Sequence, residues 1–380
     1  MSQYQKEKDF KKQNNEFIKV NKLKKIDYFY SIIKEYADQF YELLKKSGHF
    51  IYKNYIYKNR DHKSKEKDLH HLKIFVETFN VSAIEPDTIL SKFDVSSFIF
   101  PKKFEQYVSK NNLPDIIYIC FEEIVELNAN NVLISSNQDI VDLYTKKITN
   151  EICKYYPYML KIQRSLVGVL TLFFIKSELD DQFDNLYVVE NKTGNLGLGN
   201  KGNFIIKFKF NNKEFALANG HLSAGDKKEN FDKRISELKE IFGNIYETTK
   251  NITYFISGDL NFRIDLPKEK FNQICGSPSE GPVDEAQAKA KIEELKKYDQ
   301  MNEVKKIFKE EKLSEEKIIF PPTYKYNKGQ TTYNGKRTPS WTDRILHKED
   351  RNIKCIFYDT INLYLSDHKP LVGLFEVSLK

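Results

Sequence analysis

Short apolar runs separated by polar segments dominate the chain from Leu72 onward. They are rich in Ile, Val, Phe and Tyr, which are enriched in strands. The runs occupy residues 73–79, 115–121, 166–175, 203–210, 213–218 and 252–257. This pattern predicts a strand at each of these positions.

Helical periodicity fills several of the intervals between the runs. Apolar positions three and four residues apart predict helices at 140–152 and 235–245, and an Ala-, Glu- and Lys-rich segment predicts another at 285–298. Residues 277–282, SPSEGP, indicate a surface loop inside the domain. The mixture of strands and helices places the chain in the α/β class.

The first 70 residues have a different texture. They are polar and Lys-rich except at residues 26–43, where apolar side chains recur at helical spacing before Gly48. A charged linker at 58–68 follows. We therefore predict an α-helical, Lys-rich N-terminal extension and linker over 1–70, with its helix packed on the main domain, and one catalytic domain over 71–380.

Composition and charge indicate where in the cell the protein is located and which partners it binds. The 380 residues are 40% hydrophobic, enough for a sizeable core, and a net charge of +7 favours phosphate-bearing partners or an anionic membrane surface. The 4 cysteines are scattered, which favours a reducing compartment. No signal-peptide core is evident, and no run approaches the roughly 20 apolar residues of a membrane span. We expect a cytoplasmic protein that is soluble or peripheral to membranes.

Polar residues of the kind used in catalysis follow several predicted strands. They are Asn80, Glu122, Glu123, His221, Asp259 and Asn261, followed near the C-terminus by Asp343, Asp367 and His368. Each one alone is compatible with a turn or a helix cap. Together they can converge on one rim of a pair of sheets. Oxygen ligands such as Glu123 and Asn80 suit Mg²⁺, so the set predicts metal-assisted attack of water on a phosphate.

Seven motifs then identify a resemblance. They are ICFEEIVELNANN, GLGNKGN, ANGHLSAG, ISGDLNFRID, FPPTYKY, TPSWTDRIL and SDHKPL. With these motifs, the chain from about Leu72 to its end resembles the inositol polyphosphate 5-phosphatases, within the deoxyribonuclease I-like metal phosphoesterases. The resemblance implies a two-sheet β-sandwich flanked by helices, with a catalytic rim at one end.

The activity that this resemblance implies is Mg²⁺-dependent removal of a 5-phosphate. The substrates would be phosphoinositides, such as phosphatidylinositol 4,5-bisphosphate or 3,4,5-trisphosphate, or soluble inositol polyphosphates. Water would attack in line, without a phosphoenzyme.

Roles for individual residues follow from the same resemblance. Glu123 would be the main metal ligand, assisted by Asn80. Asp259 would orient or deprotonate the attacking water, and Asn261 would hold that water or a phosphoryl oxygen. His221 would donate a hydrogen bond to the phosphate or to the leaving oxygen.

The C-terminal motifs complete the implied site. His368 would donate to the phosphate, Asp343 would accept its other ring proton, and Asp367 would complete the metal and base network. Contacts to the substrate, including a neighbouring 4-phosphate, are implied for Tyr324, Lys325, Arg337, Lys336, Lys201 and Arg263.

The chain departs from the family's usual residues at several positions. Glu122 replaces Gln, Cys120 and Asn203 each replace Gly, Gly220 replaces Ser and Gly335 replaces Lys. We interpret Glu122 as a helix cap. Gly335 removes one contact that the family makes to the 4-phosphate, so it bears on whether the activity depends on that phosphate. We expect the adjacent Lys336 to supply the contact instead.

Two other functions remain open from the sequence. One is a metal-dependent phosphodiesterase of the same fold, of the nuclease or sphingomyelinase type, although TYKY and Arg337 speak against it. The other is a non-catalytic phosphoinositide-binding module. We expect an inositide partner and a membrane surface, touched by exposed residues around 98–104, and no nucleic acid. The oligomeric state is unknown from the sequence.

Overall fold

A computed structural model describes residues 69–108, 112–126, 138–166, 168–193, 201–275 and 285–380. The helix predicted at 26–43 and the loop predicted at 277–282 lie outside these ranges. Within the described ranges, no helix is long and apolar enough to cross a bilayer.

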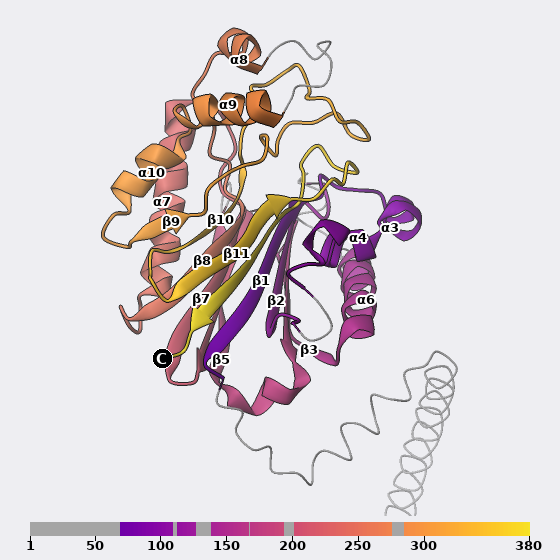
Figure 1. The fold of residues 1–380 in the computed structure, drawn as a ribbon, viewed down its shortest axis with the longest axis vertical. Coiled ribbons are helices and arrows are strands. Elements are labelled where there is room, and N and C mark those ends of the chain that lie inside the picture. The colour runs from indigo at the N-terminus through magenta and orange to yellow at the C-terminus, as the bar shows by residue number, and fades with distance from the viewer. Residues whose placement is uncertain (1–68, 109–111, 127–137, 167, 194–200, 276–284) are drawn as a thin grey trace, which may run out of the picture. The chain divides into compact units, whose positions relative to one another are not determined.

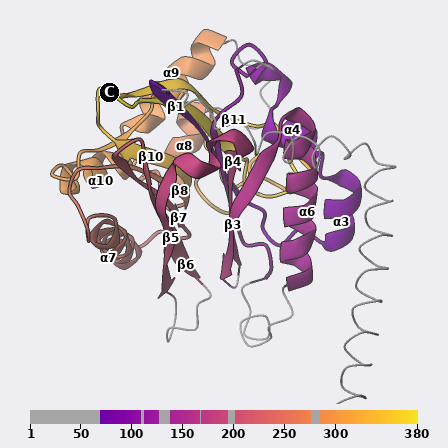
Figure 2. The same ribbon diagram turned by 90° about the horizontal axis from the view of Figure 1, so that it is seen from below.

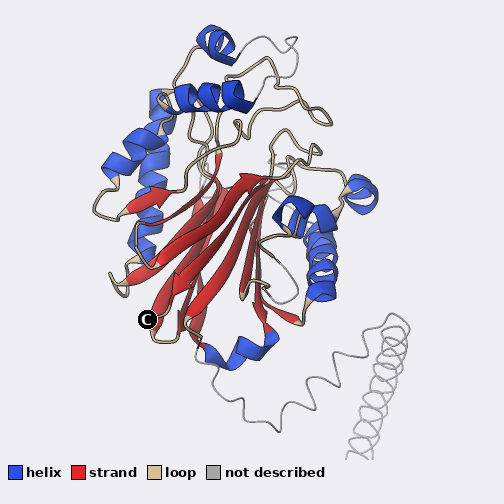
Figure 3. Cartoon of the chain, viewed as in Figure 1, coloured by secondary structure: helices blue, strands red, loops and turns tan. Residues whose placement is uncertain are grey.

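Two six-stranded sheets form the centre of this part of the chain (Figure 3). The first has the order β11-β12-β1-β2-β4-β3. Its strands are β1 (His71–Asn80), β2 (Ile116–Glu122), β3 (Tyr158–Leu166), β4 (Val169–Lys176), β11 (Ile353–Thr360) and β12 (Leu371–Ser378).

The second sheet has the order β5-β6-β7-β8-β10-β9. Its strands are β5 (Phe183–Thr193), β6 (Lys201–Phe210), β7 (Lys213–Gly220), β8 (Ile252–Asp259), β9 (Leu313–Glu315) and β10 (Asp343–Lys348). Each sheet is mixed, because β1 pairs with β2 and β7 pairs with β8 in parallel, whereas the other pairs are antiparallel.

Helices cover the outer faces of both sheets (Figures 1 and 2). The first sheet carries α3 (Pro86–Lys92), α4 (Val95–Ile99) and α6 (Gln138–Tyr155), and the second carries α7 (Lys228–Ile245) and α10 (Met301–Ile307). Helices α8 (Lys268–Cys275) and α9 (Glu285–Lys296) lie beyond the upper ends of the strands in Figure 1. Short 3-10 turns are η1 (Lys102–Phe104) and η2 (Ser177–Gln182). The predicted two-sheet sandwich flanked by helices is confirmed.

Burial on both faces explains the continuous apolar runs. In β1, Ile74 and Val76 belong to the core that the two sheets share, whereas Phe75 and Phe79 pack in the core beneath α4 and α6. A strand that is buried on both sides has no polar face, so its sequence lacks the alternation of a half-exposed strand. The central strands were therefore predictable from hydrophobicity alone.

The apolar run at 166–175 is not one strand. It contains the last residue of β3, Leu166, and most of β4, which begins at Val169. Gly168 lies between them, and its N–H donates to Leu166 O at 2.7 Å. Only β4 is a continuous apolar strand, whereas β3 carries the polar residues 163–165 just before Leu166, so the apolar run hides the turn between the two strands and leaves one glycine as its signal.

The segment at 98–104 is also placed differently from the prediction. Phe98, Ile99, Phe100 and Phe104 are buried beneath the helices of the first sheet rather than exposed. Phe98 stacks on Phe121 of β2 with ring centroids 5.5 Å apart. These apolar side chains complete the core, so they do not form the membrane-contacting surface that the sequence suggested.

Candidate active site

Strand ends from both sheets meet at one rim of the sandwich. In the β1–β2 pair Asn80 lies opposite Glu122, and in the β8–β10 pair Asp259 lies opposite Asp343. Strands β1 and β2 pack against β8. Asn80 Nδ2 therefore reaches across to Asp259 Oδ2 and donates to it at 2.9 Å. The packing of the two sheets brings together residues that are far apart in the sequence.

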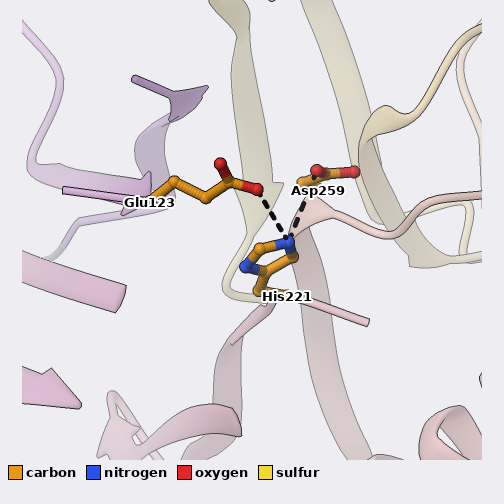
Figure 4. A group of neighbouring side chains, drawn as sticks. All are labelled: Glu123, His221 and Asp259. Atoms are coloured by element: carbon orange, nitrogen blue, oxygen red, sulfur yellow. Dashed lines mark ion pairs between the residues drawn. The ribbon is translucent and has the colours of Figure 1, made fainter. Parts of the chain in front are cut away.

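Glu123, His221 and Asp259 form a group that fits a metal ion. His221 Nε2 lies 3.7 Å from Glu123 Oε1 and 3.6 Å from Asp259 Oδ2 (Figure 4). One ligand atom from each residue lies within 4.8 Å of the others. The Glu123 side chain is 34% exposed and the His221 side chain 1%, so solvent reaches the group from the glutamate side. Two carboxylates suit an oxygen-preferring divalent cation.

Backbone geometry at two of these positions is unusual. Glu123 has φ 53° and Asn261 has φ 58°, both in the left-handed region. Asn enters this region readily, but Glu does so at a cost of about 1 kcal/mol or more. The Ala83 N–H donates to Glu123 O at 2.7 Å, which helps to hold the turn. The turn after β2 thereby carries the glutamate to the rim.

His368 and Asp343 form a second cluster at the same rim, next to Asp259. His368 Nδ1 lies 3.0 Å from Asp343 Oδ2, and that carboxylate also accepts from Thr323 Oγ1 at 2.6 Å and Thr342 Oγ1 at 3.0 Å. Burial alone lowers the pKa of His368, but the carboxylate of Asp343 and others nearby outweigh burial and raise this pKa to about 10. The ring is therefore cationic at neutral pH, and Nε2–H is its other donor.

Glu122 does not cap a helix as we had predicted. It is the last residue of β2, it is fully buried, and residues 123–126 after it are not helical. Its carboxylate accepts from Thr78 Oγ1 at 3.1 Å. Burial, together with the charges of Asp343 and Asp259, raises its pKa well above the usual value. The extra carboxyl group therefore lies beneath the rim.

Asn261 is held from two sides. Its Nδ2 donates to Leu222 O at 3.0 Å, and its backbone N–H donates to Asp259 Oδ1 at 3.1 Å. Arg263 donates from Nε to Asn261 O at 3.0 Å and from a second nitrogen to Asn261 Oδ1. An amide nitrogen has two hydrogens, so Asn261 retains one donor for a ligand.

An aromatic and basic wall adjoins His368. The Tyr324 ring lies 4.4 Å from the His368 ring, and the Arg263 guanidinium lies 5.0 Å from the centre of the same tyrosine ring. Lys325 Nζ contacts Asp367 Oδ2 at 2.7 Å. Burial alone raises the pKa of Asp367, but His368 and Lys325 outweigh burial and lower it. Asp367 thus pairs with Lys325 and lies close enough to His368 for the two charges to interact.

Of the remaining residues predicted to bind substrate, Arg337 has a contact that connects it to this wall. Arg337 reaches it through Asp226, with Arg337 Nη1 3.6 Å from Asp226 Oδ2. Lys336 is exposed, and its backbone N–H bonds Asn334 Oδ1 at 3.0 Å. Lys201 is the first residue of β6.

Several residues of the site were missed from the sequence. Thr323 and Thr342 hold Asp343, and Asp226 lies between two arginines. Thr342 immediately precedes Asp343 in the sequence, so its hydrogen bond to that carboxylate could have been predicted. Asp226 follows a glycine in a turn-like segment, where an aspartate is expected for local reasons, so nothing set it apart.

Comparisons with known proteins give a matching family model, curated relatives and solved structures of similar fold. A family model described as Endonuclease/Exonuclease/phosphatase family 2 matches residues 77–374. The polyphosphatidylinositol phosphatase INP53 of Saccharomyces cerevisiae is 29% identical over 323 residues, which cover 81% of this chain and 27% of that relative. The chain thus spans little more than a quarter of the length of the curated relatives that it matches.

Two solved structures bear on fold and site. The inositol polyphosphate 5-phosphatase domain of SpSynaptojanin, in complex with inositol (1,4)-bisphosphate and calcium, is 27% identical with a TM-score of 0.64, covering 81% of this chain and 84% of that one. A Cimex nitrophorin in a ferrous NO complex is 16% identical with a TM-score of 0.60, covering 82% and 99%. The nitrophorin shows the fold alone, so function has to be argued from the site.

Proposed function

Because the chain belongs to Endonuclease/Exonuclease/phosphatase family 2, we propose that it is a Mg²⁺-dependent phosphatase that removes the 5-phosphate from phosphoinositides or soluble inositol polyphosphates. The names of the relatives support this proposal, since INP53 is a polyphosphatidylinositol phosphatase. The SpSynaptojanin domain holds inositol (1,4)-bisphosphate, which is what inositol 1,4,5-trisphosphate becomes when its 5-phosphate is lost.

The arrangement of side chains around Asp259 is the main support for this proposal. Asp259 accepts from Asn80 and lies in the group of Glu123 and His221, while its strand neighbour Asp343 holds His368. A proton acceptor, a cation site and a cationic donor are therefore within one rim. Metal-assisted attack of water on a phosphate ester uses these three elements.

A divalent cation at this rim would be held mainly by Glu123, with Asp259 and Asn80 beside it. We propose Mg²⁺, because carboxylate and amide oxygens suit it. When bound, the cation would neutralise charge on the phosphate. The relative's structure contains calcium, a cation that also prefers oxygen ligands.

Asp259 is the residue that we assign to the attacking water. Each of its oxygens already accepts one hydrogen bond, Oδ2 from Asn80 Nδ2 and Oδ1 from the Asn261 N–H. Those two bonds fix the plane of the carboxylate and leave lone pairs free for the water. Asp259 would then orient the water and accept its proton during in-line attack, without a phosphoenzyme.

His368 and His221 would serve the phosphate oxygens. His368 keeps its proton because of Asp343, so its Nε2–H donates to a phosphoryl oxygen as charge develops there. His221, whose Nε2 faces Glu123 and Asp259, would donate to the phosphate or to the leaving oxygen. Asn261 would hold the water or a phosphoryl oxygen with its remaining amide hydrogen.

The basic wall would hold a second phosphate of the substrate. Lys325 and Arg263 supply cations next to Tyr324, and Arg337 is linked to Arg263 through Asp226. The two guanidinium groups can each bind phosphate with two donors. Lys201 and Lys336 are further candidates. Basic side chains can hold the phosphates of either class of substrate, so the preference for an inositide over nucleic acid rests on the motif TYKY together with Arg337.

A lipid substrate would require binding at a membrane surface. We propose peripheral association from the cytoplasmic side, supported by the net charge of +7. Because the apolar side chains of Phe98, Ile99, Phe100 and Phe104 are buried, insertion of apolar side chains into the membrane would use other surfaces.

Phosphate release tests the proposed activity. The panel contains soluble inositol phosphates and vesicle phosphoinositides with and without a 5-phosphate, each assayed with Mg²⁺. We expect release only from substrates that carry the 5-phosphate, and a loss of about 10²-fold or more in Asp259→Asn. The matched control is Asp232→Asn, an exposed aspartate of α7 paired with Lys228.

The alternatives make different predictions in the same assay. Cleavage of abasic DNA or sphingomyelin without phosphate release would replace the phosphatase by a phosphodiesterase. Binding of inositides with no turnover would favour a non-catalytic module.

A further inference from the structure

Asp226 lies between two arginines at the edge of the basic wall. Its Oδ1 is 3.6 Å from Arg263 Nε, and its Oδ2 is 3.6 Å from Arg337 Nη1. One carboxylate therefore faces two guanidinium groups that we have assigned to a second phosphate of the substrate.

The backbone that carries Asp226 is firmly held. Arg234 of α7 donates to Ser223 O at 3.0 Å and to Gly225 O at 2.9 Å, and Glu237 accepts from the Ser223 N–H at 2.8 Å. Gly225 has φ 122°, a conformation that favours glycine. The Asp226 side chain, in contrast, is 61% exposed. The loop thus presents an exposed carboxylate from a backbone that is held in place.

Arg263 has an unmet donor. The residue is only 5% exposed, its Nε and one terminal nitrogen bond Asn261, and its Nη1 is buried without a hydrogen-bond partner among the described residues. A buried guanidinium N–H without an acceptor is costly, so such an atom points to an oxygen that a ligand supplies. The guanidinium lies against Tyr324, which contacts His368.

The contacts of Asp226 are weaker than those that a phosphate would make. Both N···O distances of 3.6 Å are longer than a hydrogen bond, and the pair with Arg337 is exposed to solvent. A phosphate group can form short, charge-assisted bonds to two guanidinium groups at once. It can therefore displace the carboxylate, but only by breaking its two ion pairs and moving a negative charge.

We infer that Asp226 is a specificity-determining residue that competes with a second phosphate group of the substrate for Arg263 and Arg337. The inference rests on the proposed function, and it concerns the basic wall rather than the hydrolytic rim. The competition affects substrates that carry the neighbouring phosphate and leaves those without it unaffected. Asp226 thus reduces the enzyme's preference for more highly phosphorylated headgroups.

Kinetics of Asp226→Asn test this inference. The substrates are inositol 1,4,5-trisphosphate and inositol 1,5-bisphosphate, which lacks the 4-phosphate. We expect KM for the trisphosphate to fall about two- to fivefold, the range set by exposed ion pairs, with kcat unchanged and with KM for the bisphosphate unchanged. An unchanged KM for the trisphosphate, or an equal fall for both substrates, would overturn it.

Asp232→Asn is the matched control. It removes the same charge from a side chain that is also 61% exposed and that pairs with Lys228 on α7. A long-range effect of net charge would lower KM equally in both variants, and that result would also overturn the inference. Melting temperatures of the two variants show whether either change disturbs the fold.

Calorimetric binding separates this inference from the proposed activity. The probe is inositol 1,4-bisphosphate, which retains the 4-phosphate and requires no turnover. Tighter binding to Asp226→Asn than to the wild type and Asp232→Asn supports the inference even if no inositide is hydrolysed. Equal binding to all three proteins would overturn it even if the phosphatase activity is present.

Discussion

At the scale of single residues, the charge of His368 depends mainly on the carboxylate of Asp343, with smaller contributions from Asp259 and Asp367. Asp343 is fully buried and is bonded by Thr323, Thr342 and the His368 ring, so its position is set from three sides. The same arrangement fixes both the orientation of the imidazole and its protonated state.

Replacing Asp343 with Asn tests that dependence. The amide keeps the size of the side chain but removes the charge that retains the proton on His368. We expect kcat for phosphate release to fall about 10²- to 10⁴-fold, as for other carboxylates that orient a histidine, with little change in KM. Steady-state kinetics of the variant, with Asp232→Asn as the control, measure the fall in kcat. A rise in KM with unchanged kcat would contradict the assigned role.

Glu77 is a buried acid outside the site. It lies in β1 between Phe75 and Phe79, and neither carboxylate oxygen has a hydrogen-bond partner among the described residues. Burial raises its pKa well above the usual 4.5. Above pH 4.5 the unfolded chain loses the Glu77 proton, whereas the folded protein retains it. The contribution of Glu77 to the free energy of unfolding therefore falls as pH rises above 4.5.

The variant Glu77→Gln removes this titration while keeping the shape. We expect its free energy of unfolding to gain on the wild type between pH 5 and pH 8, by as much as about 1.4 kcal/mol for each unit of pKa shift that lies in the window. Urea unfolding at both pH values gives the difference. A difference that is the same at both would show that Glu77 is not held neutral in the fold.

The residues at strand ends were the most predictable part of the site. Asn80, Glu123 and Asp259 each follow a strongly apolar run, so their place at a rim follows from the pattern. Glu122 was misjudged because burial on the inner face of β2 cannot be read from a pair of acids. Asp226 had no signal, because its role depends on two arginines distant in sequence.

At the scale of secondary structure, predictability followed burial. The central strands β1, β2, β7 and β8 and the long helices α6 and α7 were predicted because their apolar patterns are strong. The edge strands β5 and β11 were not, since each is partly exposed and mixes polar with apolar residues. Helix α4 has only five residues and relies on Asp94, which caps it through Ser96 and Ser97.

A buried charge network links three elements next to the site. Arg344 of β10 is fully buried, with Nη2 2.7 Å from Asp299 Oδ1, just before α10, and Nη1 3.0 Å from Glu315 Oε2 of β9. Arg344 follows Asp343 directly, so the network also fixes the start of β10. Each charge is compensated only while its partners stay in place.

Asp299→Asn is expected to weaken this network strongly. Removal of one carboxylate leaves the buried arginine only partly compensated, with an expected loss of about 3 kcal/mol in the free energy of unfolding. Denaturant unfolding measures the loss. The control is Glu303→Gln, an exposed acid on α10, which should change stability by no more than about 0.5 kcal/mol. Equal effects of the two variants would contradict the importance of the network.

At the scale of the molecule, the rim exists because two sheets pack face to face. Polar ends of β1 and β2 from one sheet and of β8 and β10 from the other meet across the shared core. The sequence predicted this architecture through the motifs. It did not predict the strand order, in which β12 lies between β11 and β1, because pairing between segments more than 200 residues apart leaves no local pattern.

The catalytic domain is predicted to be residues 71–380, and the compact unit that contains it begins at Leu69. Every residue that we assign to the site lies between Asn80 and His368, within the two sheets and their loops. We expect a fragment that begins at Leu69 to keep kcat and KM of the whole chain for a soluble inositol phosphate, within about twofold. A much lower kcat in a fragment that is folded by circular dichroism would assign part of the activity to residues 1–68.

The position of the phosphate that is removed tests the central claim most directly. Inositol 1,4,5-trisphosphate is incubated with the protein and Mg²⁺, and the product is identified by nuclear magnetic resonance. We predict inositol 1,4-bisphosphate as the sole product, with none formed when the metal is chelated. Loss of the 1- or 4-phosphate, or the same product at the same rate without a divalent cation, would contradict the account.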